Sequence, residues 1–164
     1  MAPKAKYTFK EFCELFDHKD LLELWDYEKN VKNPEDIGYR SSNAFFFKCP
    51  NGIHESREIP VLNIVKAYEK GKLYTICHKC NSIGQYIVDN YGSTYLSSIW
   101  SEKNECSAFD IEKRSTKRIW LKCLDDITHP DYDLQALNFV NTHRCPYCAG
   151  KRVCESNSLA GKFP

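Results

Sequence analysis

The sequence predicts an α+β fold of two small zinc units in tandem, each a short β-hairpin with flanking helices. Two observations lead to this prediction: a segment of the first half is repeated in the second, and each half holds three cysteines and one histidine at similar spacing. The chain has 164 residues, and a unit of roughly half that length buries too little apolar surface to be firmly stable alone. A bound metal ion would compensate for the small core.

The repeat is visible when residues 28–54 are aligned with residues 102–128, at a shift of 74 positions. Ten of the 27 aligned positions are identical, where unrelated segments would share roughly two. The first-half members of these pairs are Glu28, Lys29, Asn30, Asp36, Ile37, Arg40, Ser41, Lys48, Cys49 and Ile53. Trp25 and Trp100 correspond at a shift of 75. We infer that the halves are duplicates.

The first predicted helix begins at Thr8, which forms a capping box with Glu11 ahead of an amphipathic apolar pattern over residues 9–16. A second short helix is expected around residues 21–25. Residues 44–49 and 118–123 are aromatic or β-branched runs that end in cysteine, and we interpret both as strands that lead into a metal-binding turn.

Ser82 is placed to cap a helix over residues 83–91, which we expect to link the units. Residues 55–76 and 130–144 give no clear pattern, and hairpin, loop or short helix are all compatible with them. The predicted organisation is therefore unit one over residues 1–82, unit two over residues 83–152, and the start of a truncated third repeat or a tail over residues 153–164.

Metal ligands are predicted from spacing. The first half reads Cys49-x4-His54-x22-Cys77-x2-Cys80, and the second reads Cys123-x5-His129-x15-Cys145-x2-Cys148. Three thiolates and one imidazole form a tetrahedral set that suits zinc, so we expect two Zn²⁺ ions per chain. His78 and His143 lie next to the cysteine pairs and compete for the histidine position.

The pair Cys145-Pro146-Tyr147-Cys148 also has the form of a glutaredoxin active site. A thioredoxin-like site lies early in a βαβ unit, whereas only 16 residues follow Cys148. The spacing therefore favours a metal site over redox catalysis.

The motifs resemble the tandem "probable zinc-ribbon" repeats of the treble-clef zinc-finger class. Those repeats carry a helix that ends in Trp, then Lys-Asn, a Ser before a strand that ends in Lys-Cys, a Gly-His-like element and a final Cys-Pro-x-Cys. The second half matches at Trp100, Lys103, Asn104, Ser115, Trp120, Leu121, Lys122, Cys123, His129 and 145–148, and the first at Trp25, Lys29, Asn30, Ser41, Phe47, Lys48, Cys49, His54, Cys77 and Cys80. The resemblance implies treble-clef-like units that associate with nucleic acid, DNA more than RNA.

A nucleic-acid surface must be local, because the formal net charge of the chain is only +1. Residues 113–122 hold five basic residues and no acid. The candidate contact residues are Arg114, Lys117, Arg118, Lys122, Lys151 and Arg152. The alternative for this strand is a solvated sheet edge that Lys and Arg protect from aggregation.

Two other function classes stay open. The zinc units could form a protein-interaction or architectural subunit whose contact surface includes residues 45–47. A His-Asn-His nuclease is the less favoured alternative, because it needs a general-base histidine and an open metal position. We therefore expect no enzyme activity, no small-molecule substrate and no membrane partner.

The expected location is an intracellular reducing compartment, namely cytoplasm, nucleus or a viral particle, and not a secreted one. Clustered thiols there bind metal more often than they form disulfides. The first twenty residues lack a continuous signal-peptide core, and the longest apolar run is far shorter than a membrane helix.

Overall fold

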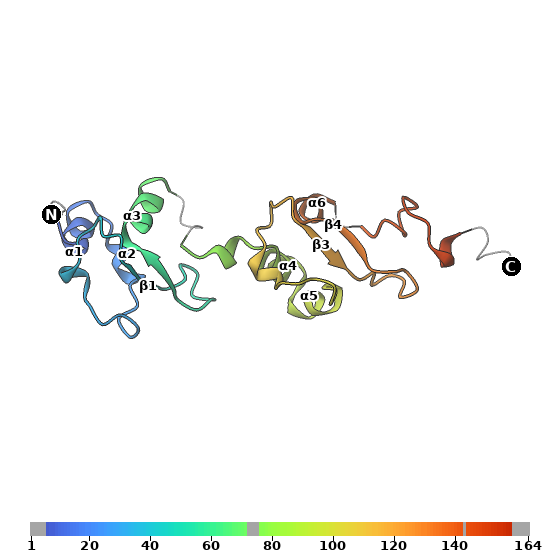
Figure 1. Ribbon diagram of the computed structural model, residues 1–164, viewed down its shortest axis with the longest axis horizontal. Helices are drawn as coiled ribbons and strands as arrows, with labels where there is room; N and C mark the ends of the chain where they lie inside the picture. The colour runs from blue at the N-terminus through green and yellow to red at the C-terminus, as the bar shows by residue number, and fades with distance from the viewer. Residues whose placement is uncertain (1–5, 72–75, 143, 159–164) are drawn as a thin grey trace. The chain divides into compact units, whose positions relative to one another are not determined.

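The computed structural model describes residues 6–71, 76–142 and 144–158. The chain divides into two units, Met1–His78 and Lys79–Pro164, and this division falls close to the predicted boundary after residue 82. Unit one is drawn in blue to green in Figure 1, and most of unit two in yellow to red. Within the described ranges, none of the helices has the length and apolar character needed to span a membrane.

Unit one is a two-stranded hairpin with helices before and after it. Its elements are α1 (Phe9–Leu15), α2 (Lys19–Glu23), the 3-10 turn η1 (Pro34–Asp36), β1 (Ala44–Phe47), β2 (Arg57–Pro60) and α3 (Val61–Glu69). The strands are antiparallel, with Phe47 opposite Arg57. The capping box is confirmed, because the Thr8 hydroxyl accepts from the Glu11 amide at 3.1 Å and the Glu11 carboxylate accepts from the Thr8 amide at 2.8 Å.

The core of unit one is mainly aromatic where the helices meet the hairpin. Phe9, Trp25 and Phe47 are fully buried, and the ring centroids of Phe9 and Phe47 each lie within 6 Å of that of Trp25. Such tilted and edge-to-face pairs stabilise a small core beyond the gain from burial alone. Leu21 and Ile64 complete the core from α2 and α3, so both helices are fixed against the strands.

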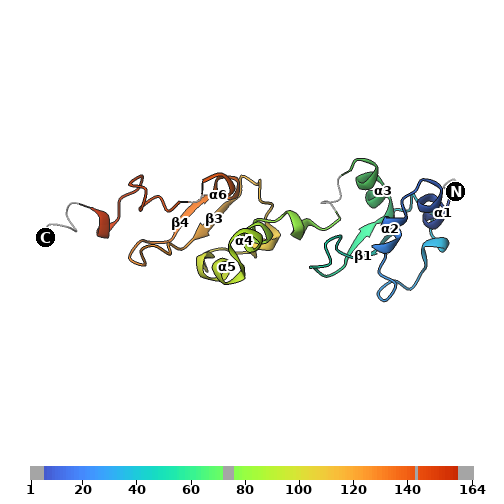
Figure 2. The ribbon, with the colours of Figure 1, turned by 180° about the vertical axis from the view of Figure 1, so that it is seen from behind.

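Unit two has the same order of elements. It contains α4 (Ile83–Tyr91), α5 (Ser93–Ile99), the 3-10 turn η4 (Ala108–Asp110), β3 (Arg118–Leu121), β4 (Tyr132–Gln135), α6 (Ala136–Thr142) and the turn η5 (Glu155–Asn157). The hairpin is antiparallel, with Leu121 opposite Tyr132. Both views in Figures 1 and 2 place α4 beside α5, and α6 beside the hairpin.

The expected role of helix 83–91 as a linker is wrong. Ser82 does cap it, because its hydroxyl accepts from the Gln85 amide at 3.0 Å, but Ile83 and Ile87 are fully buried in the core of unit two. Gly84 shows how tightly α4 packs, since a Cβ there would lie 2.8 Å from the backbone carbon of Ala108. Helix α4 is therefore a core helix and not a connection.

The strands end earlier than the sequence predicts. They stop at Phe47 and Leu121, two residues before Cys49 and Cys123, because the backbone turns away to form the ligand loop. Residues 55–76 and 130–144, which gave no clear pattern, each form the second strand of the hairpin and the helix after it within the described residues.

Matched hydrogen bonds fix both units in the same way. The first amide of the first helix donates to a carbonyl after the 3-10 turn, from Phe9 to Ile37 and from Ile83 to Ile111. The helix after the hairpin is held by a serine carbonyl, from Leu62 to Ser41 at 3.0 Å and from Leu137 to Ser115 at 3.0 Å. Corresponding residues thus perform the same structural task in both halves.

Candidate metal centres and basic surface

The first metal centre gathers the four residues predicted for it. Cys49 and His54 lie in the loop between β1 and β2, and Cys77 and Cys80 follow α3, the latter within the 3-10 turn η3 (His78–Asn81). The four ligand atoms all lie within 4.8 Å of one another. The Nδ1 atom of His54 lies 3.4 Å from the Cys77 sulfur and 3.7 Å from the Cys49 sulfur.

The second centre repeats this arrangement between the β3–β4 loop and residues 145–148. The ligand atoms of Cys123, His129, Cys145 and Cys148 likewise lie within 4.8 Å of one another. The Nδ1 atom of His129 lies 3.4 Å from the Cys148 sulfur, and the Cys123 and Cys148 sulfurs are 3.5 Å apart. The prediction that each half assembles a Cys3His set is confirmed.

The donor sets fit a tetrahedral metal ion. Thiolates at about 2.3 Å and an imidazole nitrogen at about 2.0 Å from a tetrahedral ion lie roughly 3.5 to 3.8 Å from one another. The separations in both clusters, 3.4 to 3.8 Å, are close to this range. Two cysteines of each set are buried, so the sulfurs converge inside the fold, where a cation would balance their charge. Each set could therefore hold one metal ion.

The histidine of the second centre is oriented by a carboxylate. The Nδ1 atom of His129 faces the sulfurs, while its Nε2 atom lies 3.5 Å from Oδ2 of Asp126. The Thr128 hydroxyl and backbone amide donate to Oδ1 of Asp126 at 2.6 and 2.9 Å, and these bonds hold the pKa of Asp126 below its usual value. A carboxylate behind a ligand histidine fixes the ring and strengthens metal binding.

Of the two competing histidines, His78 is not part of the first centre. His78 turns its Nδ1 toward the Arg57 guanidinium, which donates to it at 2.8 Å, and His143 lies outside the described residues. Cys13 is fully buried in the core of unit one, and burial raises the pKa of its thiol to about 12. Among residues 6–71, 76–142 and 144–158, no further group of three or more metal-ligating side chains is gathered.

The predicted basic surface of unit two is organised around one carboxylate. Arg118 and Arg152 each place a guanidinium nitrogen on Asp133, at 3.0 and 3.1 Å from its two oxygens. Lys122 pairs with Glu102 at 3.3 Å. Lys117 donates to the Cys106 sulfur at 3.3 Å, while Arg114 and Lys151 are exposed.

Two structural roles escaped the sequence analysis. The side chains of Asn30 and Asn104 bind the backbone of a strand. Each accepts from one strand amide and donates to the carbonyl of the same residue, Phe46 for Asn30 and Trp120 for Asn104. The sequence signal that could have indicated this role is that both asparagines occupy the same position in the repeat.

A basic hollow of unit one was also missed. It lies between β2 and α3 and is lined by Arg57, Asn63, Lys66 and Lys70 among others. The signal was the helical spacing of residues 63, 66 and 70, which places them on one face, but no helix had been assigned to that segment.

Comparison with known proteins gives one weak similarity. The chain is 26% identical over 165 residues to "Uncharacterized protein R635" of Acanthamoeba polyphaga mimivirus. The match covers 89% of this chain, which spans only 38% of that relative's length. No protein-family model matches the chain.

Proposed function

We propose that the chain is a zinc-stabilised nucleic-acid-binding module without catalytic activity, built from duplicated units related to the "probable zinc-ribbon" repeats of the treble-clef class. DNA is the favoured partner over RNA. Zinc is the metal that best suits three thiolates and one imidazole at tetrahedral separations. Thiolate ligands need a reducing compartment, so we place the protein inside the cell or in a viral particle.

The observation that carries the nucleic-acid proposal is the pair of arginines on Asp133. One carboxylate offsets only one of the two charges, so Arg118 and Arg152 leave a net positive site. Their side chains are 59% and 40% exposed, and each guanidinium has five N–H donors, so donors remain for phosphate oxygens. Trp120 lies on the same strand as Arg118, and the Lys103 ammonium lies over its ring, 5.0 Å from the ring centroid.

The non-catalytic part of the proposal follows from the donor count. Four protein ligands complete a tetrahedral zinc site and leave no position for an activated water. His54 and His129, the histidines that could otherwise act as a general base, belong to the two sets of candidate metal ligands. Plasmid DNA incubated with the protein and added Mg²⁺ or Mn²⁺ should stay intact, and cleavage that persists after repurification would contradict this.

The binding proposal is tested by fluorescence anisotropy with labelled duplex DNA, single-stranded DNA and RNA across a salt series. Each phosphate contact on duplex DNA contributes about 0.9 to the slope of log affinity against log salt. Replacing Arg114 and Arg118 with Gln should lower that slope by about two, with zinc content unchanged. If this variant binds with the same slope and affinity as the parent, the basic strand is a solvated sheet edge and not a contact surface.

The interaction alternative receives less support from its proposed residues. Phe47 is fully buried, and Phe45 packs on Trp25 with ring centroids 5.0 Å apart. The Lys29 ammonium covers Phe46 at 5.6 Å. These side chains therefore serve the fold, and a protein that binds none of the three nucleic acids would restore the alternative.

A further inference from the structure

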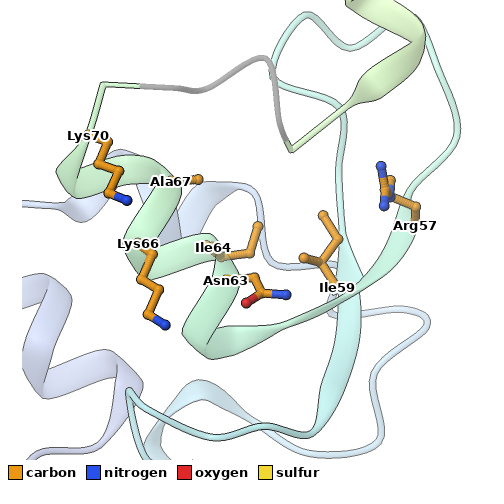
Figure 3. A pocket seen from close by; sticks show the side chains of 7 residues that line it. All are labelled: Arg57, Ile59, Asn63, Ile64, Lys66, Ala67 and Lys70. Carbon is orange, nitrogen blue, oxygen red and sulfur yellow. The ribbon is translucent and has the colours of Figure 1, made fainter. Parts of the chain in front are cut away.

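Unit one has a basic hollow that the unit-two patch does not explain. Figure 3 shows it between β2 and α3, with Lys66, Lys70 and the Asn63 amide on the helix side and Arg57 on the strand side. Its volume is about 350 Å³. Ile59 and Ile64, which are almost fully buried, form its floor.

The cations of this hollow form no ion pair with an acid among the described residues. No carboxylate lines it, and no ion pair to Arg57, Lys66 or Lys70 occurs within the part of the chain that the structure describes. Arg57 donates through one nitrogen to His78 and keeps its other donors. Glu69, the acidic residue of α3, lines a neighbouring hollow together with Arg40 and Lys66, but it forms no ion pair with Lys66.

The same positions of unit two carry no such charge. Matching Leu62 with Leu137 through their common bond to a serine carbonyl places Tyr132 where unit one has Arg57, and Asn141 where it has Lys66. Helix α6 contains no basic residue at all. The cations are therefore a feature of unit one and not a requirement of the shared fold.

We propose that this hollow receives the sugar–phosphate backbone of a nucleic-acid strand, so that each unit has its own contact surface. The proposal rests on the nucleic-acid function proposed above. Ammonium and guanidinium groups with an amide donor are the groups that bind backbone phosphates, and an apolar floor suits the sugar face. Three cations that form no ion pair with an acid also favour a phosphate group at this hollow.

The test uses the full, zinc-loaded chain and a fluorescein-labelled DNA duplex of about 20 base pairs. Binding is measured by fluorescence anisotropy from low to moderate salt concentration. The variant Lys66→Gln/Lys70→Gln should lower the log–log salt slope by about two and weaken binding by about tenfold or more near 0.1 M salt. Arg57→Gln is made separately because Arg57 also contacts His78. The matched control Lys19→Gln/Lys32→Gln removes the same charge from exposed sites of unit one outside the hollow.

The outcomes separate the two proposals. Binding that weakens in the hollow variant but not in the control, with zinc content and thermal stability unchanged, supports the hollow as a contact surface. If the parent and the hollow variant bind with the same affinity and the same salt slope, the hollow is not a contact surface, and the proposed nucleic-acid function is unaffected. A parent that binds none of duplex DNA, single-stranded DNA or RNA overturns both. If binding weakens equally in the hollow variant and in the control, the effect comes from the overall charge of the chain, and the proposal that the hollow is a contact surface is also overturned.

Discussion

The two units share their internal contacts but differ in where they carry positive charge. In unit one, cations that form no ion pair lie on β2 and along α3 to its C-terminal end. In unit two, the basic residues lie along β3 and after the second cysteine pair, and several of them form ion pairs with Asp133 or Glu102. The buried aromatic and aliphatic residues, the caps and the metal ligands occupy matched positions. This difference teaches that the core and the set of candidate metal ligands are shared by the two units, whereas the charges on their outer faces have diverged.

The metal centres differ in one respect as well. His129 has a carboxylate behind it, and this carboxylate is itself held by Thr128. The corresponding loop of unit one, residues 50–53, contains no acidic residue. The following experiments test how far the two units are alike.

The largest effect is expected from removing a ligand. Cys77→Ser should unfold unit one and Cys145→Ser should unfold unit two, since the metal supplies much of the folding free energy of each unit. Zinc content should fall from about two equivalents to about one, and the amide NMR signals of the other unit should persist. Cys106→Ser, outside both sets, is the control and should retain both ions. Loss of both units in either variant would mean a single cooperative fold.

The next effect concerns the orientation of the histidine. Asp126→Asn should reduce metal affinity at the second centre about 10- to 100-fold and leave the first unchanged. Competition with a chromogenic chelator measures both constants in one titration. Asp125→Asn, at the exposed neighbouring residue, should change neither, and equal loss in the two variants would point to net charge as the cause.

A smaller effect is expected from the paired asparagines. Asn30→Ala should destabilise unit one by about 2 kcal/mol, because it removes two hydrogen bonds to the backbone of Phe46. Asn104→Ala should cost somewhat more, since its amide also donates to the Ser101 carbonyl at 2.9 Å. Chemical denaturation of the zinc-loaded protein gives both values. A negligible loss in either variant would show that the two asparagines are not equivalent.

The smallest effect is the contribution of Tyr68 in unit one to the pH dependence of stability. The Tyr68 hydroxyl donates to the Asp20 carboxylate at 2.6 Å, and this bond raises the pKa of Tyr68 to about 12. The neutral tyrosine is the form that binds, so the stabilisation is complete below pH about 10 and is lost as pH rises toward about 12. Tyr68→Phe should remove this alkaline loss and cost about 0.5 to 1 kcal/mol at neutral pH. An unchanged alkaline profile in Tyr68→Phe would assign the loss to other groups.

The elements that the sequence predicted are those with local signals. The capping box at Thr8, the Ser82 cap and the cysteine spacing are each readable over a few residues, and all three were found. Helix α3 was missed because it starts directly after Pro60, without a side-chain cap. Its first turn is held instead by the carbonyls of Asn43 and Ser41, about twenty residues earlier in the chain, and no local pattern encodes such a bond.

The candidate sites likewise differ in whether a local sequence pattern predicts them. Ligand identity follows from spacing because zinc imposes one geometry, whereas the basic hollow depends on how a strand and a helix are placed. The contact of Arg152 with Asp133 joins residues 19 positions apart and required the structure. Two of the three arginines of the predicted patch, Arg118 and Arg152, are thus brought together, while their binding role stays a prediction.

The asparagine amides also bear on self-association. Each hairpin has only two strands, so the outer edge of β1 or β3 would offer free amide and carbonyl groups to a second molecule. Asn30 and Asn104 occupy that edge at Phe46 and Trp120, and Asp26 and Ser101 donate their backbone amides to the same two carbonyls. The amide side chain takes the place of a neighbouring strand. We therefore expect these side chains to protect both hairpin edges from pairing with the strand of a second molecule.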